Sequence, residues 1–271
     1  MLSSNNYNPE KFEIIIHRGH NLNAPENTVA GIKEILAFNI EPFIEIDVCV
    51  TKDNIPVVFH DLSFDRLCGD PRLISETFYR DLPKRKDTHE ISKLENILAF
   101  FPEQRFLLDL RTQIHPVFFS ESSISLNQLE SPLNKITKAI RRVLRPKDPG
   151  RIRMITANPD DRIYVKRHIP KFEIDIAEIF VREQLSSLTA ESSASILGTE
   201  TKRFYIRFRD VTPEIISWAH SLELKIIATC APSRRSINNS QLMLEKCISW
   251  GMDGLITSPI NQKFIETWKN L

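Results

Sequence analysis

Short apolar segments alternate with amphipathic segments along most of the chain. Apolar runs of strand length occur at 14–17, 43–48, 106–110, 152–156, 174–180, 204–208, 225–229 and 254–257. Helical patterns follow them at 28–38, 93–101, 133–144, 160–167, 183–188, 213–222, 236–250 and 259–268. Such alternation predicts parallel strands with crossover helices. Eight strand-helix pairs in 271 residues predict an α/β fold, a TIM (β/α)8 barrel that forms a single domain over residues 1–271.

Two segments depart from this rhythm. The apolar run at 55–59 begins only a few residues after the second strand, and a parallel crossover needs a dozen or more residues. The turn Thr51-Lys52-Asp53-Asn54 has hairpin length, so we expect a β-hairpin extension after strand 2 that carries His60 and Asp61 to the barrel mouth. The stretch 112–150 has the weakest pattern and predicts a long, partly irregular loop before a basic helix.

Local signals mark several helix ends. Three predicted helices begin with a capping side chain followed by proline, at Asn158-Pro159, Thr212-Pro213 and Ser258-Pro259. Asn39 follows the first predicted helix, and asparagine tolerates the left-handed backbone that often ends a helix.

Composition excludes several classes of protein. Hydrophobic residues make up 41% of the chain, which is enough for a sizeable core. The formal net charge is +1, so no bulk field favours nucleic acid, and we expect no nucleic-acid partner. Four scattered cysteines predict reduced structural thiols rather than a zinc site or disulfides. Residues 1–11 are polar and do not resemble a signal peptide, and no apolar run reaches the ~18 residues of a transmembrane segment. We therefore expect a cytoplasmic protein. Export without a cleaved signal would leave no trace in the sequence.

Polar side chains gather at the carboxyl ends of the first three predicted strands, where TIM barrels place their reactive groups. Residues two apart on a strand point to the same face. The groups concerned are His17-Arg18-Gly19, Glu45 and Asp47, His60-Asp61, and Asp109 and Arg111.

Three carboxylates facing one cavity would repel each other unless a cation lay among them. Glu45, Asp47 and Asp109 therefore predict a site for a hard divalent ion, Mg²⁺ or Ca²⁺. Arg18 and Arg111 can each bind phosphoryl oxygens in a bidentate manner.

His17 and His60 offer two imidazoles that can act as acid and base near neutral pH. A lone histidine at a strand end is more often structural than catalytic, so this interpretation depends on the histidines lying with the acidic and basic groups.

Structural interpretations remain open for the same residues. Glu45 and Asp47 could form a solvated strand edge, and Asp109 and Arg111 a simple ion pair. We interpret four further histidines as structural and two basic clusters as solvated faces; these are His89, His115, His168 and His220, and the clusters Lys84-Arg85-Lys86 and Arg141-Arg142.

The order and spacing of these motifs resemble the glycerophosphodiester phosphodiesterase family. The resemblance rests on His17-Arg18-Gly19, Pro25-Glu26-Asn27-Thr28, Ile44-Glu45-Ile46-Asp47-Val48, Thr51-Lys52-Asp53 and Val57-Val58-Phe59-His60-Asp61, with Arg66 after them. It continues more weakly at Asp109-Leu110-Arg111, Val211-Thr212-Pro213-Glu214 and 251–257. It covers the first ~110 and the last ~70 residues and is far more specific than one short motif.

The resemblance implies a TIM barrel that hydrolyses glycerophosphodiesters to glycerol 3-phosphate and an alcohol with a divalent cation. It implies that Glu45, Asp47 and Asp109 hold the metal, that Arg18 and Arg111 bind phosphate, and that His17 and His60 exchange protons. We expect His17 as the base and His60 as the acid.

Several positions depart from the family pattern. Asp109 and Arg111 stand where glutamate and lysine are usual, and arginine is not equivalent to lysine at a phosphate. Ala228-Thr229 lacks a common tryptophan, and Ser258 replaces an aspartate. Asn39, Asn54 and Glu223 occupy glycine positions.

These departures keep other functions open. The expected partner is a small-molecule glycerophosphodiester or a lysophospholipid. One alternative is a non-catalytic homologue that binds a phosphorylated ligand. Another is a phosphodiesterase that releases a cyclic phosphate.

Overall fold

The computed structural model describes residues 12–20, 22–111, 126–143, 149–156, 173–177, 202–230 and 237–270. By their contacts, the residues divide into two compact units, one of residues 18–175 and one of residues 1–17 with 176–271. The helices expected at 160–167 and 183–188, and the expected cap at Asn158, lie outside the described residues.

The unit of residues 18–175 is built on a parallel sheet. Its strands β2 (Phe43–Val50), β6 (Arg105–Leu110) and β7 (Ile152–Thr156) are those predicted from the apolar runs. β2 lies between β6, which is parallel to it, and β3 (Pro56–Val58), which is antiparallel. The register of β2 and β6 places Asp47 directly beside Asp109, so two of the predicted metal ligands start from neighbouring backbone positions.

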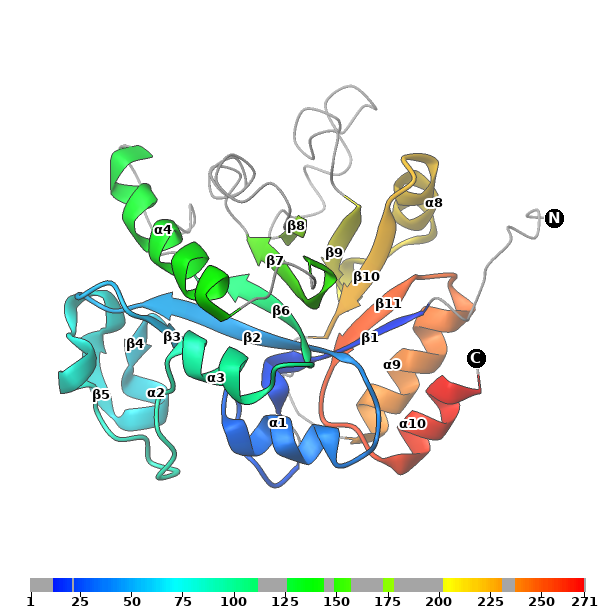
Figure 1. Cartoon of the computed structure of the whole chain (residues 1–271). Helices are drawn as coiled ribbons and strands as arrows, with labels where there is room; N and C mark the ends of the chain where they lie inside the picture. The colour runs from blue at the N-terminus through cyan, green and yellow to red at the C-terminus, as the bar shows by residue number, and fades with distance from the viewer. Residues whose placement is uncertain are drawn as a thin grey trace. The chain divides into compact units, whose positions relative to one another are not determined.

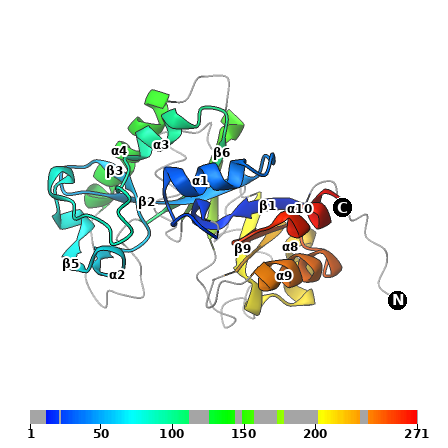
Figure 2. The same ribbon diagram turned by 90° about the horizontal axis from the view of Figure 1, so that it is seen from below.

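Helices of this unit bury their apolar faces. α1 (Val29–Leu36) begins at Thr28, whose side chain accepts a hydrogen bond from the Gly31 amide, and it buries Ile32 and Ile35. α3 (Leu94–Phe100) and α4 (Leu126–Val143) lie side by side in Figures 1 and 2.

The segment between β3 and α3 shares a small core with β2 and β3. It contains β4 (Ser63–Phe64), α2 (Asp65–Cys68) and β5 (Asp70–Leu73), and β4 and β5 pair antiparallel. Phe59 and Phe64 meet edge to face at the centre of this core, with ring centroids 5.6 Å apart. The core gives residues 62–91, which we call the insertion, a fixed backbone next to β2 and β3.

The second unit is also a parallel sheet flanked by helices. β1 (Glu13–Ile16) pairs with β11 (Gly254–Thr257), which pairs with β10 (Lys225–Thr229), and β10 pairs with β9 (Arg203–Arg207). The last two residues of β8 (Glu173–Ala177) pair with β9. Its helices are α8 (Pro213–Ser221), α9 (Ile237–Ser249) and α10 (Gln262–Lys269), and the strands match the predicted runs closely.

Helix ends are predicted less well than strands. Thr212 caps α8 as expected, accepting a bond from the Ile215 amide. The cap predicted at Ser258-Pro259 is wrong, because the Asn261 side chain caps α10 by accepting a bond from the Phe264 amide. The start predicted for α4 at residue 133 is also wrong, since the helix begins at Leu126, and Leu126, Leu129 and Leu133 already have helical spacing in the sequence.

Left-handed backbone occurs at three of the non-glycine positions singled out in the sequence. Asn39, Asn54 and Glu223 have φ angles of 54°, 61° and 58°. The four cysteines are free, as predicted. Within the described part of the chain, none of the helices combines the length and the apolar character needed to cross a bilayer.

Candidate active site

Three carboxylates gather at one end of the β2–β6 pair. Glu45 and Asp47 come from β2 and Asp109 from β6, and each offers an oxygen within 4.8 Å of the others. Glu45 is 3% exposed and Asp47 is 1% exposed. This burial removes the alternative that Glu45 and Asp47 form a solvated strand edge. A compact set of oxygen ligands of this kind suits a hard divalent cation.

The electrostatics of the cluster are unfavourable without a compensating charge. Burial raises the pKa of Glu45 well above its usual value, and the charges of Asp47 and Asp109 raise it further. Burial also raises the pKa of Asp109, and Arg111 offsets this only in part. The cluster therefore favours the binding of either protons or a cation.

Arg18 lies against two of these carboxylates. It follows β1 in a 3-10 turn (His17–Gly19) and has a left-handed φ of 54°. This backbone directs its amide to Glu45, with N and Oε2 2.6 Å apart. Its Nε lies 3.5 Å from an Asp47 oxygen and is buried without a hydrogen-bond partner. A buried cationic donor that makes no hydrogen bond suits an anionic ligand such as a phosphoryl group.

Arg111 forms more than the simple ion pair considered from the sequence. Its Nη1 lies 3.3 Å from Asp109 Oδ2, and its Nε lies 3.9 Å from Asp47 Oδ1. The same guanidinium reaches His60, with Nη2 3.2 Å from the ring Nε2. Arg111 therefore connects the acidic cluster to the imidazole.

The contacts of His60 assign its tautomer. Arginine can only donate hydrogen bonds, so Nε2 of His60 is the acceptor that faces Arg111. Nδ1 then carries the hydrogen and donates it to Asp61 at 2.6 Å. Burial alone would raise the pKa of Asp61, yet hydrogen bonds from His60 and Arg66 lower it below its usual value. Asp61 is therefore a carboxylate that orients the ring.

His17 opens the 3-10 turn that contains Arg18 and is partly buried. It ends the N-terminal segment of the second unit, whereas the other predicted site residues belong to the unit of residues 18–175. Its predicted role stays a prediction. The structure brings together the remaining six, Arg18, Glu45, Asp47, His60, Asp109 and Arg111, through the contacts described above.

Asn27 belongs to the site, although the sequence analysis assigned it no role. It is 1% exposed and has a left-handed φ of 58°. Its amide group donates to Asp47 Oδ2 at 2.8 Å and accepts from the Asp47 backbone amide at 3.1 Å. The available signal was an asparagine in a short motif before a helix, since asparagine adopts left-handed backbone at low cost.

The solvated-face prediction for Lys84-Arg85-Lys86 is confirmed for the two lysines, which are exposed, and wrong for Arg85. Within Lys84-Arg85-Lys86, the Arg85 side chain is 0% exposed. It pairs with Asp87 at 2.6 Å and donates to the Glu26 carbonyl at 3.1 Å. The run of basic residues did not indicate that Arg85 is buried, because its contact with the Glu26 carbonyl forms only in the folded chain.

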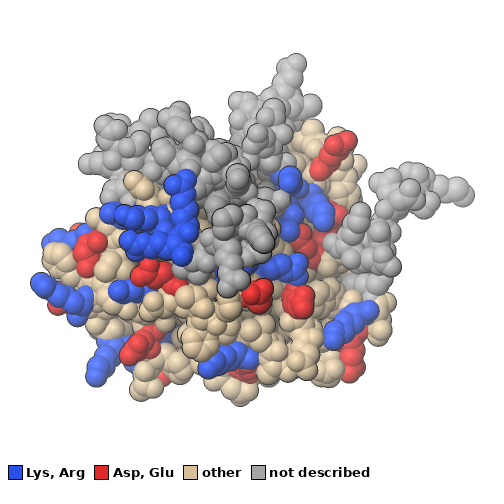
Figure 3. All heavy atoms as spheres, viewed as in Figure 1, with Lys and Arg blue, Asp and Glu red and all other residues tan. Residues whose placement is uncertain are grey.

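Other basic and histidine predictions agree with the structure where it describes them. Arg141 and Arg142 are exposed on α4, and basic side chains gather over this helix in Figure 3. His89 contacts the Asp87 carbonyl, and His220 contacts Asp253 at 2.9 Å, which are structural contacts. His115 and His168 lie outside the described residues.

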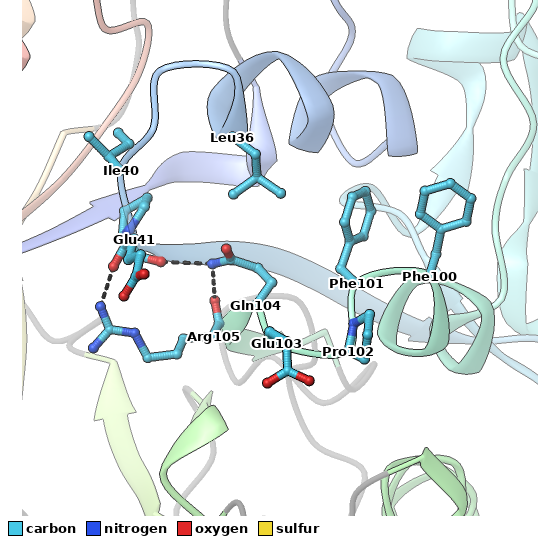
Figure 4. Close-up of a pocket in the computed structure, with 10 residues that line it drawn as sticks. Leu36, Ile40, Glu41, Phe100, Phe101, Pro102, Glu103, Gln104 and Arg105 are labelled. Carbon is cyan, nitrogen blue, oxygen red and sulfur yellow. Dashed lines mark hydrogen bonds between the residues drawn. The ribbon is translucent and has the colours of Figure 1, made fainter.

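A pocket of about 510 Å³ lies at the opposite ends of β2 and β6 (Figure 4). Phe100, Phe101 and Pro102 line one side of it, and Gln104 spans its floor by donating to the Pro42 and Arg105 carbonyls. Asp47 and Asp109 lie toward the other ends of the same strands. This pocket is therefore separate from the acidic cluster.

Comparisons with solved structures show the fold. The chain resembles a glycerophosphoryl diester phosphodiesterase from Silicibacter pomeroyi, with a TM-score of 0.73 and 18% identity over 96% of this chain and 93% of that one. It also resembles a phosphodiesterase from Oleispira antarctica, solved in complex with the product sn-glycerol-3-phosphate, with a TM-score of 0.71 and 20% identity over 96% and 97% of the two chains. The chain therefore has the TIM-barrel-like α/β fold of these proteins.

Two comparisons concern the sequence. A segment is 41% identical over 70 residues to human glycerophosphodiester phosphodiesterase 1, covering 26% of this chain and 21% of that protein. Another is 37% identical over 87 residues to the glycerophosphodiester phosphodiesterase of Caldanaerobacter subterraneus, covering 32% of each. The chain thus matches about a fifth to a third of the length of these relatives. The model of the glycerophosphoryl diester phosphodiesterase family matches residues 17–260, and on this match the chain belongs to that family.

Proposed function

We propose that this protein hydrolyses glycerophosphodiesters to glycerol 3-phosphate and an alcohol. The observation that carries the proposal is the buried cluster of Glu45, Asp47 and Asp109 with a guanidinium on either side of it. Family membership supports the same class of reaction. The arrangement can hold a phosphodiester against a cation while two arginines neutralise its oxygens.

Glu45, Asp47 and Asp109 would hold a divalent cation, Mg²⁺ or Ca²⁺, since all three offer oxygen ligands. When bound, the cation would supply charge neutralisation and polarise the phosphoryl group. Asn27 would keep Asp47 in place, because it holds both the carboxylate and the backbone of that residue. The raised pKa values of Glu45 and Asp109 fit a site at which a bound cation would neutralise the clustered carboxylates.

Arg18 and Arg111 would bind the phosphate. Arg18 offers its Nε, which makes no hydrogen bond, and Arg111 already lies between the acidic cluster and His60. Turning Arg111 toward a phosphoryl oxygen would release Nε2 of His60, which then becomes free to carry a proton. Arg111 occupies the position where the family usually has lysine, and we assign it to phosphate binding. Its planar guanidinium can bind two phosphoryl oxygens at once.

His17 and His60 would exchange protons with the reactants. Water attacks phosphorus, its proton passes to one imidazole, and the P–O bond to the alcohol breaks as the other imidazole protonates the departing oxygen. His17 as the base and His60 as the acid remain our assignment. In the acid role His60 must carry its proton on Nε2, and Asp61 stabilises that charged ring through Nδ1.

The scaffold of this site would be one closed eight-stranded barrel over the whole chain. In it, the antiparallel pair of β2 and β3 would form a hairpin extension. The extension would hold His60 directly after β3, within reach of Arg111.

The test is release of glycerol 3-phosphate from a panel of glycerophosphodiesters and lysophospholipids, with Mg²⁺, Ca²⁺ or a chelator. We expect cation-dependent release, lowered at least ~100-fold in Glu45→Gln and His60→Ala. A matched control is His89→Ala, because His89 contacts its own loop and lies outside the site. Activity that ignores the chelator would overturn the metal assignment.

The alternatives give different outcomes in the same assay. A cyclic phosphate product in place of glycerol 3-phosphate would identify the cyclising reaction. Binding of glycerol 3-phosphate without turnover of any diester would identify a non-catalytic phosphate-binding protein.

A further inference from the structure

Arg66 bridges two parts of the site that are far apart in the sequence. Its Nε lies 2.6 Å from Asp61 Oδ2, and its Nη2 lies 2.5 Å from Glu26 Oε1. Asp61 orients His60, and Glu26 holds the Arg18 guanidinium at 3.1 Å. A single guanidinium thus contacts the carboxylate behind the imidazole and the carboxylate behind a phosphate-binding arginine.

Glu26 is the buried carboxylate that links Arg66 to Arg18. Its side chain is 4% exposed and accepts hydrogen bonds from both Arg18 and Arg66. Removing one cation from a buried carboxylate leaves its charge poorly compensated. Without Arg66, Glu26 would draw Arg18 more strongly to itself, and Asp61 would lose the partner that fixes its second oxygen.

The insertion holds Arg66 in position. Phe64 and Leu67, on either side of Arg66, belong to the core of the insertion. The Leu67 carbonyl accepts a hydrogen bond from the Lys86 amide at 2.8 Å. The neighbouring Arg85 donates to the Glu26 carbonyl, so two arginines from the insertion converge on the same residue of the site.

We propose that Arg66 is a positioning residue that sets the proton-transfer group His60 and the phosphate-binding group Arg18 relative to each other. This inference rests on the proposed function. The Arg66 guanidinium pairs with the two supporting carboxylates and, among the described residues, not with Glu45, Asp47 or Asp109. Its loss should therefore impair turnover and leave cation binding intact.

The test compares Arg66→Ala and Arg66→Lys with Arg72→Ala. Arg72 is a matched control, because it also pairs with a carboxylate of the insertion, Asp70 at 2.7 Å, and is similarly exposed. We expect a loss in kcat of roughly 10–100-fold for Arg66→Ala, which is typical when a supporting partner is removed. Arg66→Lys should lose most of this activity too, since an ammonium cannot bridge two carboxylates as a planar fork does. Arg72→Ala should stay within about twofold.

Two further measurements separate positioning from general damage. Added guanidinium ion should restore part of the activity of Arg66→Ala and none to Arg66→Lys, whose side chain fills the space. Calorimetric titration with Mg²⁺ and Ca²⁺ should give the same affinity for the wild type and both Arg66 variants. A structural role alone would produce no rescue.

The outcomes also distinguish this inference from the proposed function. If the wild type releases no product from any diester, the proposed function fails. If the wild type is active and Arg66→Lys matches Arg72→Ala in kcat, the inference is overturned while the function stands. Should Arg66→Ala not fold, the folded Arg66→Lys variant decides the question by its kcat.

Discussion

At the scale of single residues, Asn27 joins the loop before α1 to the acidic cluster. Its side-chain amide donates to the Asp47 carboxylate and accepts from the Asp47 backbone. Asn27→Asp would keep the shape and the acceptor but place a second carboxylate against Asp47. We expect a loss of about 2–4 kcal/mol in the free energy of unfolding, because a buried donor becomes a like charge.

Chemical denaturation would measure this loss, and Asn96→Asp serves as the control. Asn96 is exposed in the first turn of α3, where a negative charge is favourable. Its replacement should leave stability within ~0.5 kcal/mol. Equal stability of the two variants would show that the Asn27 amide does not hold Asp47.

The residues that bear charge were easier to predict than the residues that hold them. Glu45, Asp47 and Asp109 follow from strand periodicity, since alternate positions share a face and strand ends share an edge. The burial of Arg85 was harder to predict, because one of its partners, the Glu26 carbonyl, is distant in the sequence and faces it only after the insertion has folded. A contact that spans 59 residues leaves no periodic trace in the sequence.

At the scale of elements, α1 packs unusually close to the turn that contains Arg18. A Cβ atom added at Gly31 would lie 2.2 Å from the Gly19 carbonyl oxygen and 2.9 Å from that of Pro25. Gly31→Ala would therefore force the first turn of α1 away from both segments. We expect a loss of about 1–3 kcal/mol in stability and a fall in activity, because Gly19 directly follows Arg18.

Thermal unfolding of Gly31→Ala against Gly150→Ala would measure this effect. Gly150 is exposed, and an added Cβ there would have no neighbour within 4 Å. A chain of this size loses roughly 2–4 °C in Tm per kcal/mol. An unchanged Tm for Gly31→Ala would mean that the helix and the turn can separate without cost.

Strands were predicted well and helix ends less well, for a physical reason. Buried parallel strands are continuous apolar runs, so β10 and β11 were located at their observed residues. A helix end depends on which side chain reaches an unpaired amide, and several nearby residues can do so. Asn261 does this for α10, although Ser258 had the more conspicuous motif.

At the scale of the whole molecule, the acidic cluster makes stability depend on pH. The folded protein holds the pKa of Glu45 and of Asp109 above their usual values, so it binds more protons than the unfolded chain. The destabilisation is fully present above the raised pKa values and disappears as pH falls toward the usual values. The cation-free protein should therefore be more stable near pH 5 than near pH 8.

Calorimetry of the protein with a chelator present, at pH 5 and at pH 8, would measure this difference in stability. We expect it to be at least roughly 2–4 °C in Tm, or about 1 kcal/mol. Glu45→Gln should raise the Tm of the chelated protein at pH 8 and reduce the pH dependence. Adding Mg²⁺ or Ca²⁺ at pH 8 should stabilise the wild type by mass action and this variant much less. If the Tm changed with pH equally in the wild type and in Glu45→Gln, the destabilisation would not come from the acidic cluster.

The pairing of β1 with β11 has a consequence for biosynthesis. Residues 13–16 are synthesised well before their partners 254–257, because the two paired strands lie far apart in the sequence. Until β11 is made, the edge of β1 that pairs with it has unpaired backbone groups, whereas β2, β3 and β6 can pair soon after synthesis. A chain interrupted before residue 254 would thus keep an open strand edge, which makes it a substrate for chaperones and proteases.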